Sequence, residues 1–301
     1  MGGDLNPETA RRPRGWTSLM VASAFAFGIV GCNQAATTGA APAATEKAAA
    51  EAEEVEFPEF AAEPAELATI PVNEIVQSLR LNATAISLGK TVYAANCAAC
   101  HGEELGGSRE QHAPNLADAD WLFSGDHLDS GGVIKLASDV EWTVLYGIRN
   151  EHKKARGQEA DMVAYLPEFR NEHDTMAYGN MRFLTDEEID DVAEYVMQVS
   201  NQQVTDPGKA GRGRALFMDR ANCFDCHGDD ATGNPALGST NLTRPDLYLF
   251  GSDRATVIES IKQGRRGTMP AFEGKLRADE LKAVSVYVFS RALKEPDALP
   301  R

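Results

Sequence analysis

The sequence predicts an all-α protein built from two tandem repeats of one helical unit, for three reasons. The segment Ala95–Gly102 reappears as Ala221–Gly228 with only its fourth and fifth residues changed. Apolar residues near the end of each repeat recur at spacings of three and four, the period of an amphipathic helix. No stretch of useful length alternates polar and apolar residues at the period of a strand. We therefore expect two helical domains with long loops.

A glycine precedes an aromatic residue by four positions in the first helix of each repeat. The pairs are Gly89 with Tyr93 and Gly213 with Phe217. Residues i and i+4 share a helix face, so the glycine lets another helix approach closely and the aromatic ring packs beside it. This pattern indicates a helix crossing in each repeat.

An amphipathic helix closes each repeat. In the first repeat, Thr185 and Glu188 have the spacing of a capping box, which predicts that the helix begins there. The apolar stripes are Ile189, Val192, Val196 and Val199 in the first repeat, and Leu281, Val284, Val288 and Ala292 in the second.

The composition changes divide the chain into four parts. Residues 1–32 are a signal peptide with a lipobox-like cysteine, or a membrane anchor, and residues 33–80 are a flexible linker. Residues 81–203 form the first domain and residues 204–301 the second, with a polar, glycine-rich junction between them.

The N-terminal part carries arginines followed by the apolar run Leu19–Val30, which is short for a spanning helix. It ends in Ile29–Cys32, the pattern of a bacterial lipobox in which the cysteine is lipidated. Two explanations stay open: a lipid at Cys32, or an uncleaved span from Trp16 to Gly31. Both place the rest of the chain beyond the membrane, because the arginines stay inside. We expect a protein at the periplasmic face of the bacterial inner membrane, anchored near Cys32.

The net charge of −16 arises from 45 acidic against 29 basic residues. Nucleic acid is excluded as a partner, because phosphate binding requires a basic surface. An acidic surface suits docking to a basic protein patch, or serves solubility alone.

Four of the five cysteines form two C-x-x-C pairs, and a histidine follows each pair directly. Such a motif attaches haem through two thioethers, and its histidine is the proximal iron ligand. One motif alone also fits a zinc half-site or a redox dithiol. Two motifs at equivalent places of a repeat favour two covalently attached haem c groups. The attachment residues are Cys97, Cys100 and His101 in the first repeat, and Cys223, Cys226 and His227 in the second.

A methionine thioether opposite the histidine raises the reduction potential and closes the iron site. In the second repeat, Met269 lies in a glycine-rich loop before the last helix and is the predicted sixth ligand. In the first repeat, Met162 shares the Met-x-Ala-aromatic pattern with Met269. Met176 instead lies eight residues before Leu184, much as Met269 lies seven residues before Leu276. We choose Met162 on pattern, and Met176 stays open, as does whether each methionine serves the haem of its own domain or that of the neighbouring domain. The histidines that also compete are His112, His152 and His173.

At these residues the chain resembles class I c-type cytochromes, and more closely the di-haem subunit III of cbb3-type cytochrome c oxidases. The likeness lies in the haem motifs, in Asn241-Leu242-Thr243, in Tyr248–Gly251 and in the Met269 segment, and it covers roughly residues 81–293. The resemblance implies two cytochrome c domains in which the first and last helices cross near the glycine and aromatic pair. It also implies single-electron transfer in a respiratory chain, from a periplasmic donor protein to a membrane oxidase.

Two other functions stay open. The first is a lipid-anchored periplasmic carrier that serves another redox complex. The second is the cytochrome subunit of a periplasmic peroxidase or dehydrogenase, which in a peroxidase requires an open iron site at one haem. The sequence shows no catalytic residues of its own.

Overall fold

The computed structural model describes residues 62–118, 120–123, 128–158, 160–170 and 183–292. Within these ranges, regular secondary structure is helical and β pairing is limited to isolated bridges. The predicted all-α class is confirmed. The predicted signal or anchor, residues 33–61 of the linker, Met176 and His173 lie outside the described residues. The prediction of a flexible linker is wrong for residues 62–80, which are mainly helical because Leu67, Val72 and Ile75 are buried in a core.

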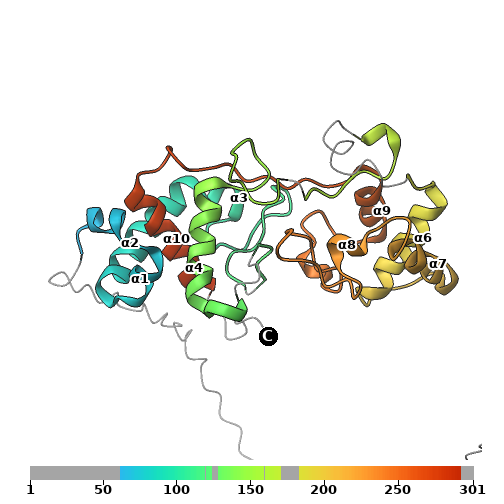
Figure 1. Ribbon diagram of the computed structural model, residues 1–301, viewed down its shortest axis with the longest axis horizontal. Coiled ribbons are helices and arrows are strands. Elements are labelled where there is room, and N and C mark those ends of the chain that lie inside the picture. The colour runs from blue at the N-terminus through green and yellow to red at the C-terminus, as the bar shows by residue number, and fades with distance from the viewer. Residues whose placement is uncertain (1–61, 119, 124–127, 159, 171–182, 293–301) are drawn as a thin grey trace, which may run out of the picture. The chain divides into compact units, whose positions relative to one another are not determined.

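The described helices are named in chain order in Figure 1. They are η2 (Pro64–Thr69), α1 (Val72–Gln77), α2 (Leu79–Asn96), α3 (Ala98–His101), α4 (Leu128–Tyr146), η4 (Pro167–Phe169), α6 (Asp186–Val199), α7 (Pro207–Phe217), α8 (Phe224–His227), η5 (Pro245–Leu247), α9 (Arg254–Gln263) and α10 (Ala278–Ala292).

Side-chain caps fix where several helices begin. The capping box predicted for α6 is present: the Thr185 hydroxyl accepts from the Glu188 amide and the Glu188 carboxylate accepts from the Thr185 amide. Asp206 caps α7 ahead of Pro207, and Asp253 caps α9. Each acceptor satisfies an amide that the first helical turn leaves unpaired.

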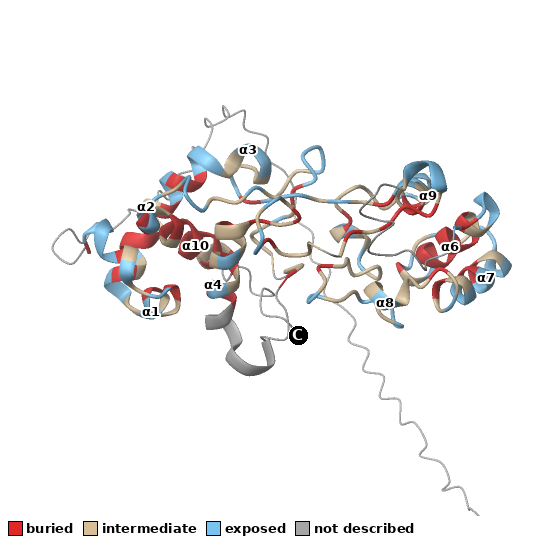
Figure 2. Cartoon of the chain, turned by 45° about the horizontal axis from the view of Figure 1, so that its top comes forward, coloured by how far each residue is buried: buried red, intermediate tan, exposed pale blue. Residues whose placement is uncertain are grey.

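Buried side chains gather in two main clusters. The first core combines α1, α2 and α4 with α10, through residues such as Ile75, Val140 and Val284. The second core combines α6 and α9 with the loops around Tyr248, through residues such as Val192 and Ile261. Figure 2 shows both cores as buried segments of the ribbon. Burial of apolar side chains is the main favourable term in the folding of each core.

The helices cross at the predicted glycines, but the partners are exchanged between the repeats. A Cβ on Gly89 of α2 would lie 2.2 Å from the carbonyl oxygen of Ala283 in α10. A Cβ on Gly213 of α7 would lie 1.9 Å from the carbonyl oxygen of Asp191 in α6. Figures 1 and 2 show α2 beside α10, and α6 beside α7.

The aromatic residues follow the same exchange. Tyr93 lies 5.6 Å from Tyr287 between ring centroids, and Phe217 lies 5.1 Å from Tyr195. The expectation that each repeat pairs its own first and last helices is therefore wrong. The physical reason is that both repeats offer the same crossing surface, so the last helix of either one fits the first helix of the other.

Two short connections carry the chain from one core to the other. The first connection follows α4 and contains Ile148 and Met162, and the second follows α9 and contains Arg265 and Met269. Ile148 pairs with Met269 in one antiparallel bridge, and Met162 pairs with Arg265 in another. The glycines that precede these connections, Gly147 and Gly264, both have φ of +71°. Each core contains elements from both sides of residue 204. The domain boundary near this residue therefore stays a prediction about the sequence repeat alone.

We find no helix among the described residues with the length and apolar character that a bilayer crossing requires.

Candidate haem sites

The two C-x-x-C-H motifs adopt the same local structure. Each forms a single helical turn, α3 and α8, that ends at a glycine with positive φ, Gly102 at +77° and Gly228 at +78°. A left-handed conformation favours glycine because a Cβ there is strained. The turn places both cysteines and the histidine of each motif on one short rigid element.

Each motif histidine is oriented by a backbone carbonyl that lies 13 residues further along the chain. The Nδ1 atom of His101 is 3.1 Å from the Pro114 oxygen, and that of His227 is 2.9 Å from the Thr240 oxygen. A carbonyl only accepts, so Nδ1 carries the proton and Nε2 keeps its lone pair. Burial lowers the pKa of both rings, which keeps them neutral. Each histidine is thus prepared as a neutral Nε2 ligand.

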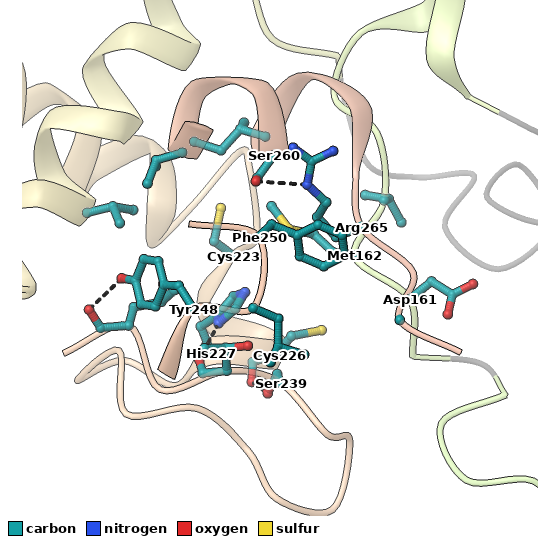
Figure 3. Close-up of a pocket in the computed structure, with 18 of the residues that line it drawn as sticks. Asp161, Met162, Cys223, Cys226, His227, Ser239, Tyr248, Phe250, Ser260 and Arg265 are labelled. Carbon is teal, nitrogen blue, oxygen red and sulfur yellow. Dashed lines mark hydrogen bonds between the residues drawn. The ribbon is translucent and has the colours of Figure 1, made fainter. Parts of the chain in front are cut away.

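An apolar cavity lies against the second motif (Figure 3). His227, Cys223 and Cys226 line one side of it, and Phe250 and Arg265 lie across from them. The remaining wall is mainly aliphatic and aromatic, with contributions from Val192, Val196, Phe217, Leu242, Tyr248 and Ile261. A flat apolar cofactor attached through two cysteines fits such a lining.

Met162 lines the same cavity as His227, and Met269 does not. The aromatic residue of its pattern, Tyr165, follows three positions later, and the Tyr165 hydroxyl is 3.7 Å from the Cys223 sulfur. Met162 and Tyr165 both belong to the second core, together with Cys223. The structure thus brings Met162 to the second motif, and not to the first motif, with which chain order had paired it.

Met269 lies with the first core. Its backbone exchanges hydrogen bonds with Ile148, at 3.0 and 2.9 Å, directly after α4. Phe272, the aromatic residue of its pattern, packs against the first core, as does Cys97. The two methionine segments have thus changed places relative to the haem motifs.

The competing histidines that the structure describes have other neighbours. His112 packs against Phe250 with 4.2 Å between ring centroids and the ring planes tilted by 30°. His152 lies 2.9 Å from a Glu273 carboxylate oxygen and stacks on Tyr146. Neither histidine lines the cavity of the second motif.

Burial keeps two of the motif thiols protonated. It raises the pKa of Cys97 to about 11 and that of Cys223 to about 12. A reactive dithiol requires a lowered thiol pKa, since the thiolate is the nucleophile. A neutral, partly buried thiol instead suits a side chain that ends in a thioether.

Sequence reasoning missed three charged residues near Met162. Asp161, 5% exposed, lies between the guanidinium groups of Arg149 and Arg266. Arg149 also stacks over Phe123, 5.4 Å from the ring centroid. The only signal in the sequence is their position beside segments already singled out, since Asp161 precedes Met162 and each arginine follows a loop glycine by two positions.

A helical fold with two C-x-x-C-H turns, each with a carbonyl-oriented histidine, defines a c-type cytochrome. Residues 86–200 match the family model for cytochrome c, and residues 208–288 match the model described as cytochrome c oxidase, cbb3-type, subunit III. The chain belongs to the family of this cbb3-type subunit, and the resemblance stated from its sequence is confirmed. Its cytochrome c domains imply covalently bound c-type haem.

Relatives with curated names support the same family. The cbb3-type cytochrome c oxidase subunit FixP of Bradyrhizobium sp. (strain ORS 278) is 38% identical over 75% of this chain and 68% of its own length. FixP of Bradyrhizobium diazoefficiens is 36% identical over the same shares. Subunit CcoP of Cereibacter sphaeroides is 35% identical over 68% of this chain and 60% of its own length.

Proposed function

We propose that this chain is a di-haem c-type cytochrome that passes single electrons as a subunit of a cbb3-type cytochrome c oxidase. Its family membership and its two equivalent haem-attachment turns support this function. When bound, each haem supplies one reversible step between Fe(III) and Fe(II), in which one electron enters or leaves.

The observation that carries the proposal is the cavity that His227 and Met162 share with Cys223 and Cys226. We assign the second haem to these four residues, although Met162 belongs to the first repeat. The first haem would be held by Cys97 and Cys100 through thioethers, and by His101 and Met269 as ligands to its iron. The second haem thus takes its methionine from the first repeat, and the first haem from the second.

Backbone hydrogen bonds orient the proposed ligands of each site. The carbonyl oxygens of Pro114 and Thr240 fix the ring orientation of the two histidines. The bridge partners Arg265 and Ile148 fix the backbone of the two methionines. The chain's part in the proposed site is thus to bind and orient, while the cofactor supplies the redox chemistry.

The ligand assignment is tested with variants of the full chain, matured with haem-attachment machinery. Met162→Ala and Met269→Ala each remove one of two methyl signals, shifted by the haem ring current, in the proton spectrum of the reduced protein. The double variant Cys223→Ala, Cys226→Ala retains only the first haem. Crossed ligation predicts that its remaining methionine signal is the one lost in Met269→Ala.

If that remaining signal is instead the one lost in Met162→Ala, each haem takes the methionine of its own repeat and the crossed assignment fails. Cys97→Ala, Cys100→Ala is the matched control, and it is expected to retain the signal lost in Met162→Ala. Copurification tests the oxidase assignment, because a subunit of the oxidase elutes with a haem-copper catalytic chain and a separate carrier does not.

We further propose that residues 1–32 place the chain at the periplasmic face of the bacterial inner membrane, anchored through Cys32 or an uncleaved span. A periplasmic donor protein would then supply the electrons. Cys32→Ser distinguishes the two anchors: it prevents attachment of a lipid at this position and leaves a spanning anchor unaffected. Mass spectrometry of the membrane-extracted chain reads the difference directly, as a lipid on Cys32 or an intact N-terminal segment.

A further inference from the structure

We propose that Asp161 is a positioning residue for the axial methionine of the second haem. The inference rests on the proposed ligation by Met162. Asp161 precedes Met162 directly and is held by two arginines, one from each repeat. Its carboxylate thereby fixes how far Met162 reaches into the cavity.

The carboxylate of Asp161 is almost fully buried and its two oxygens face different guanidinium groups. Oδ1 lies 3.2 Å from Nε of Arg149, whose side chain is 9% exposed. Oδ2 pairs with Nη1 of Arg266. The ion pair with Arg149 is largely shielded from solvent, whereas the Arg266 side chain is 39% exposed.

The two arginines are themselves fixed by backbone carbonyls. Arg149 donates from Nη2 to the Ala160 oxygen at 3.0 Å and to the Gly238 oxygen at 3.1 Å. Arg266 donates from Nη2 to the Arg149 oxygen at 3.1 Å. The hydrogen bonds that hold the partners of Asp161 therefore reach Ala160, the residue before it, and the loop that follows the second haem motif.

Met162 is the next residue of the same short extended segment. Its amide and carbonyl exchange hydrogen bonds with Arg265, at 3.2 and 3.0 Å. Successive residues of extended backbone point to opposite faces, so a fixed Asp161 orients Met162 away from itself. Figure 3 shows Met162 beside Phe250 and Arg265 within the cavity, and Asp161 at its edge.

The other methionine segment lacks this anchor. The residue before Met269 is Thr268, which is exposed and uncharged. The Met269 carbonyl accepts from the Ile148 amide and, at 2.7 Å, from Nδ2 of Asn150. Loss of the Asp161 carboxylate is therefore expected to affect the second haem and spare the first.

The experiment compares Asp161→Asn with Glu141→Gln in the full di-haem chain. The control, Glu141→Gln, removes the ion pair between Glu141 and Lys282, whose charged atoms lie 2.8 Å apart. This pair is also largely buried, and it joins α4 to α10 in the first core. Asp161→Asn removes the negative charge that faces Arg149 and Arg266. We expect the methyl signal assigned by Met162→Ala to shift or broaden, and the ferric methionine–iron absorption of the protein to fall by about a quarter to a half. Glu141→Gln leaves both unchanged.

Three results separate the possibilities. If Met162→Ala removes a signal that Asp161→Asn leaves unchanged in position and width, the positioning role is overturned and the ligation stands. If Met162→Ala removes no signal, the proposed ligation fails, and the positioning role with it. If Asp161→Asn yields no folded protein, Arg266→Gln, which removes the more exposed partner, is judged by the same two criteria.

Discussion

Met162 and Arg265 exchange two backbone hydrogen bonds across the repeats, at 3.2 and 3.0 Å. Ile148 and Met269 form the matching pair with the roles of the repeats reversed. The two pairs show how the methionine segments change places. The Met162 segment is bridged to Arg265 of the second repeat, and the Met269 segment is bridged to Ile148 of the first. Changes at one of these connections, at one helix crossing, at the buried Glu194 and at the half-buried Asp118 give the following predictions.

Replacing Gly264 with alanine is expected to displace the Met162 segment. Gly264 has φ of +71°, and a Cβ there would lie 2.3 Å from the Met162 oxygen. Backbone strain and the clash together should lower the free energy of unfolding by about 2–4 kcal/mol. Denaturant unfolding of the haem-containing chain measures the change.

The control is Gly274→Ala, since Gly274 has φ of +76° but no atom within 4 Å of the position that a Cβ would take. It carries the backbone strain without the clash, so its loss should be about 1 kcal/mol. Equal losses in the two variants would show that contact with Met162 contributes nothing.

The crossing of α6 and α7 should tolerate no side chain at Gly213. A Cβ there meets the Asp191 oxygen at 1.9 Å, so Gly213→Ala must separate the helices and is expected to cost about 2–3 kcal/mol. Gly211→Ala lies on the same helix with no atom nearby, and it should stabilise by about 0.5–1 kcal/mol through helix propensity. Thermal unfolding followed by circular dichroism checks both, and opposite signs are the expected outcome.

Glu194 is a buried link between α6, α9 and the start of α7. Its side chain is 0% exposed, and it accepts from the Thr205 amide at 3.0 Å and from Arg254 Nε at 2.8 Å. Glu194→Gln removes the buried charge that accepts from Thr205 and Arg254, while Asp190 still pairs with Arg254, so a loss of about 1–3 kcal/mol in the free energy of unfolding is expected. The exposed Glu187 on the same helix gives the control Glu187→Gln, which should change stability by less than about 0.5 kcal/mol. A similar effect of both variants would contradict this role of Glu194.

Asp118 should make the free energy of unfolding increase as the pH falls. Burial is the main cause that raises the pKa of its carboxyl from 3.8 to about 6, and Asp120 and Asp246 add repulsion. The folded state therefore binds the proton more tightly than the unfolded state, so the free energy of unfolding rises as pH falls from about 6 to about 4. Ionised Asp118 lowers stability above that range.

Asp118→Asn removes this cost. Allowing for screening by solvent, it should stabilise by about 1 kcal/mol near pH 7.5 and give no gain near pH 4. Urea unfolding at both pH values measures the difference. A gain that is the same at both would mean that the carboxyl titrates normally.

The sequence alone determined the local chemistry of this protein. Each C-x-x-C-H turn is complete within a few residues, and so are the capping box of Thr185 and Glu188 and the glycines that permit helix crossings. Local patterns of this kind depend on spacing along the chain, and spacing is visible in a sequence. The family likeness followed from the same segments.

Only the tertiary structure decided which parts belong together. Both repeats carry the same crossing surface and the same methionine pattern, so nothing local favours α6 over α10 as the partner of α2. The choice depends on long-range contacts, namely the bridges at Met162 and Met269 and the ion pair of Asp161 with Arg266, which lies 105 positions further along the chain. Such contacts join residues far apart in the chain, and no local spacing encodes them.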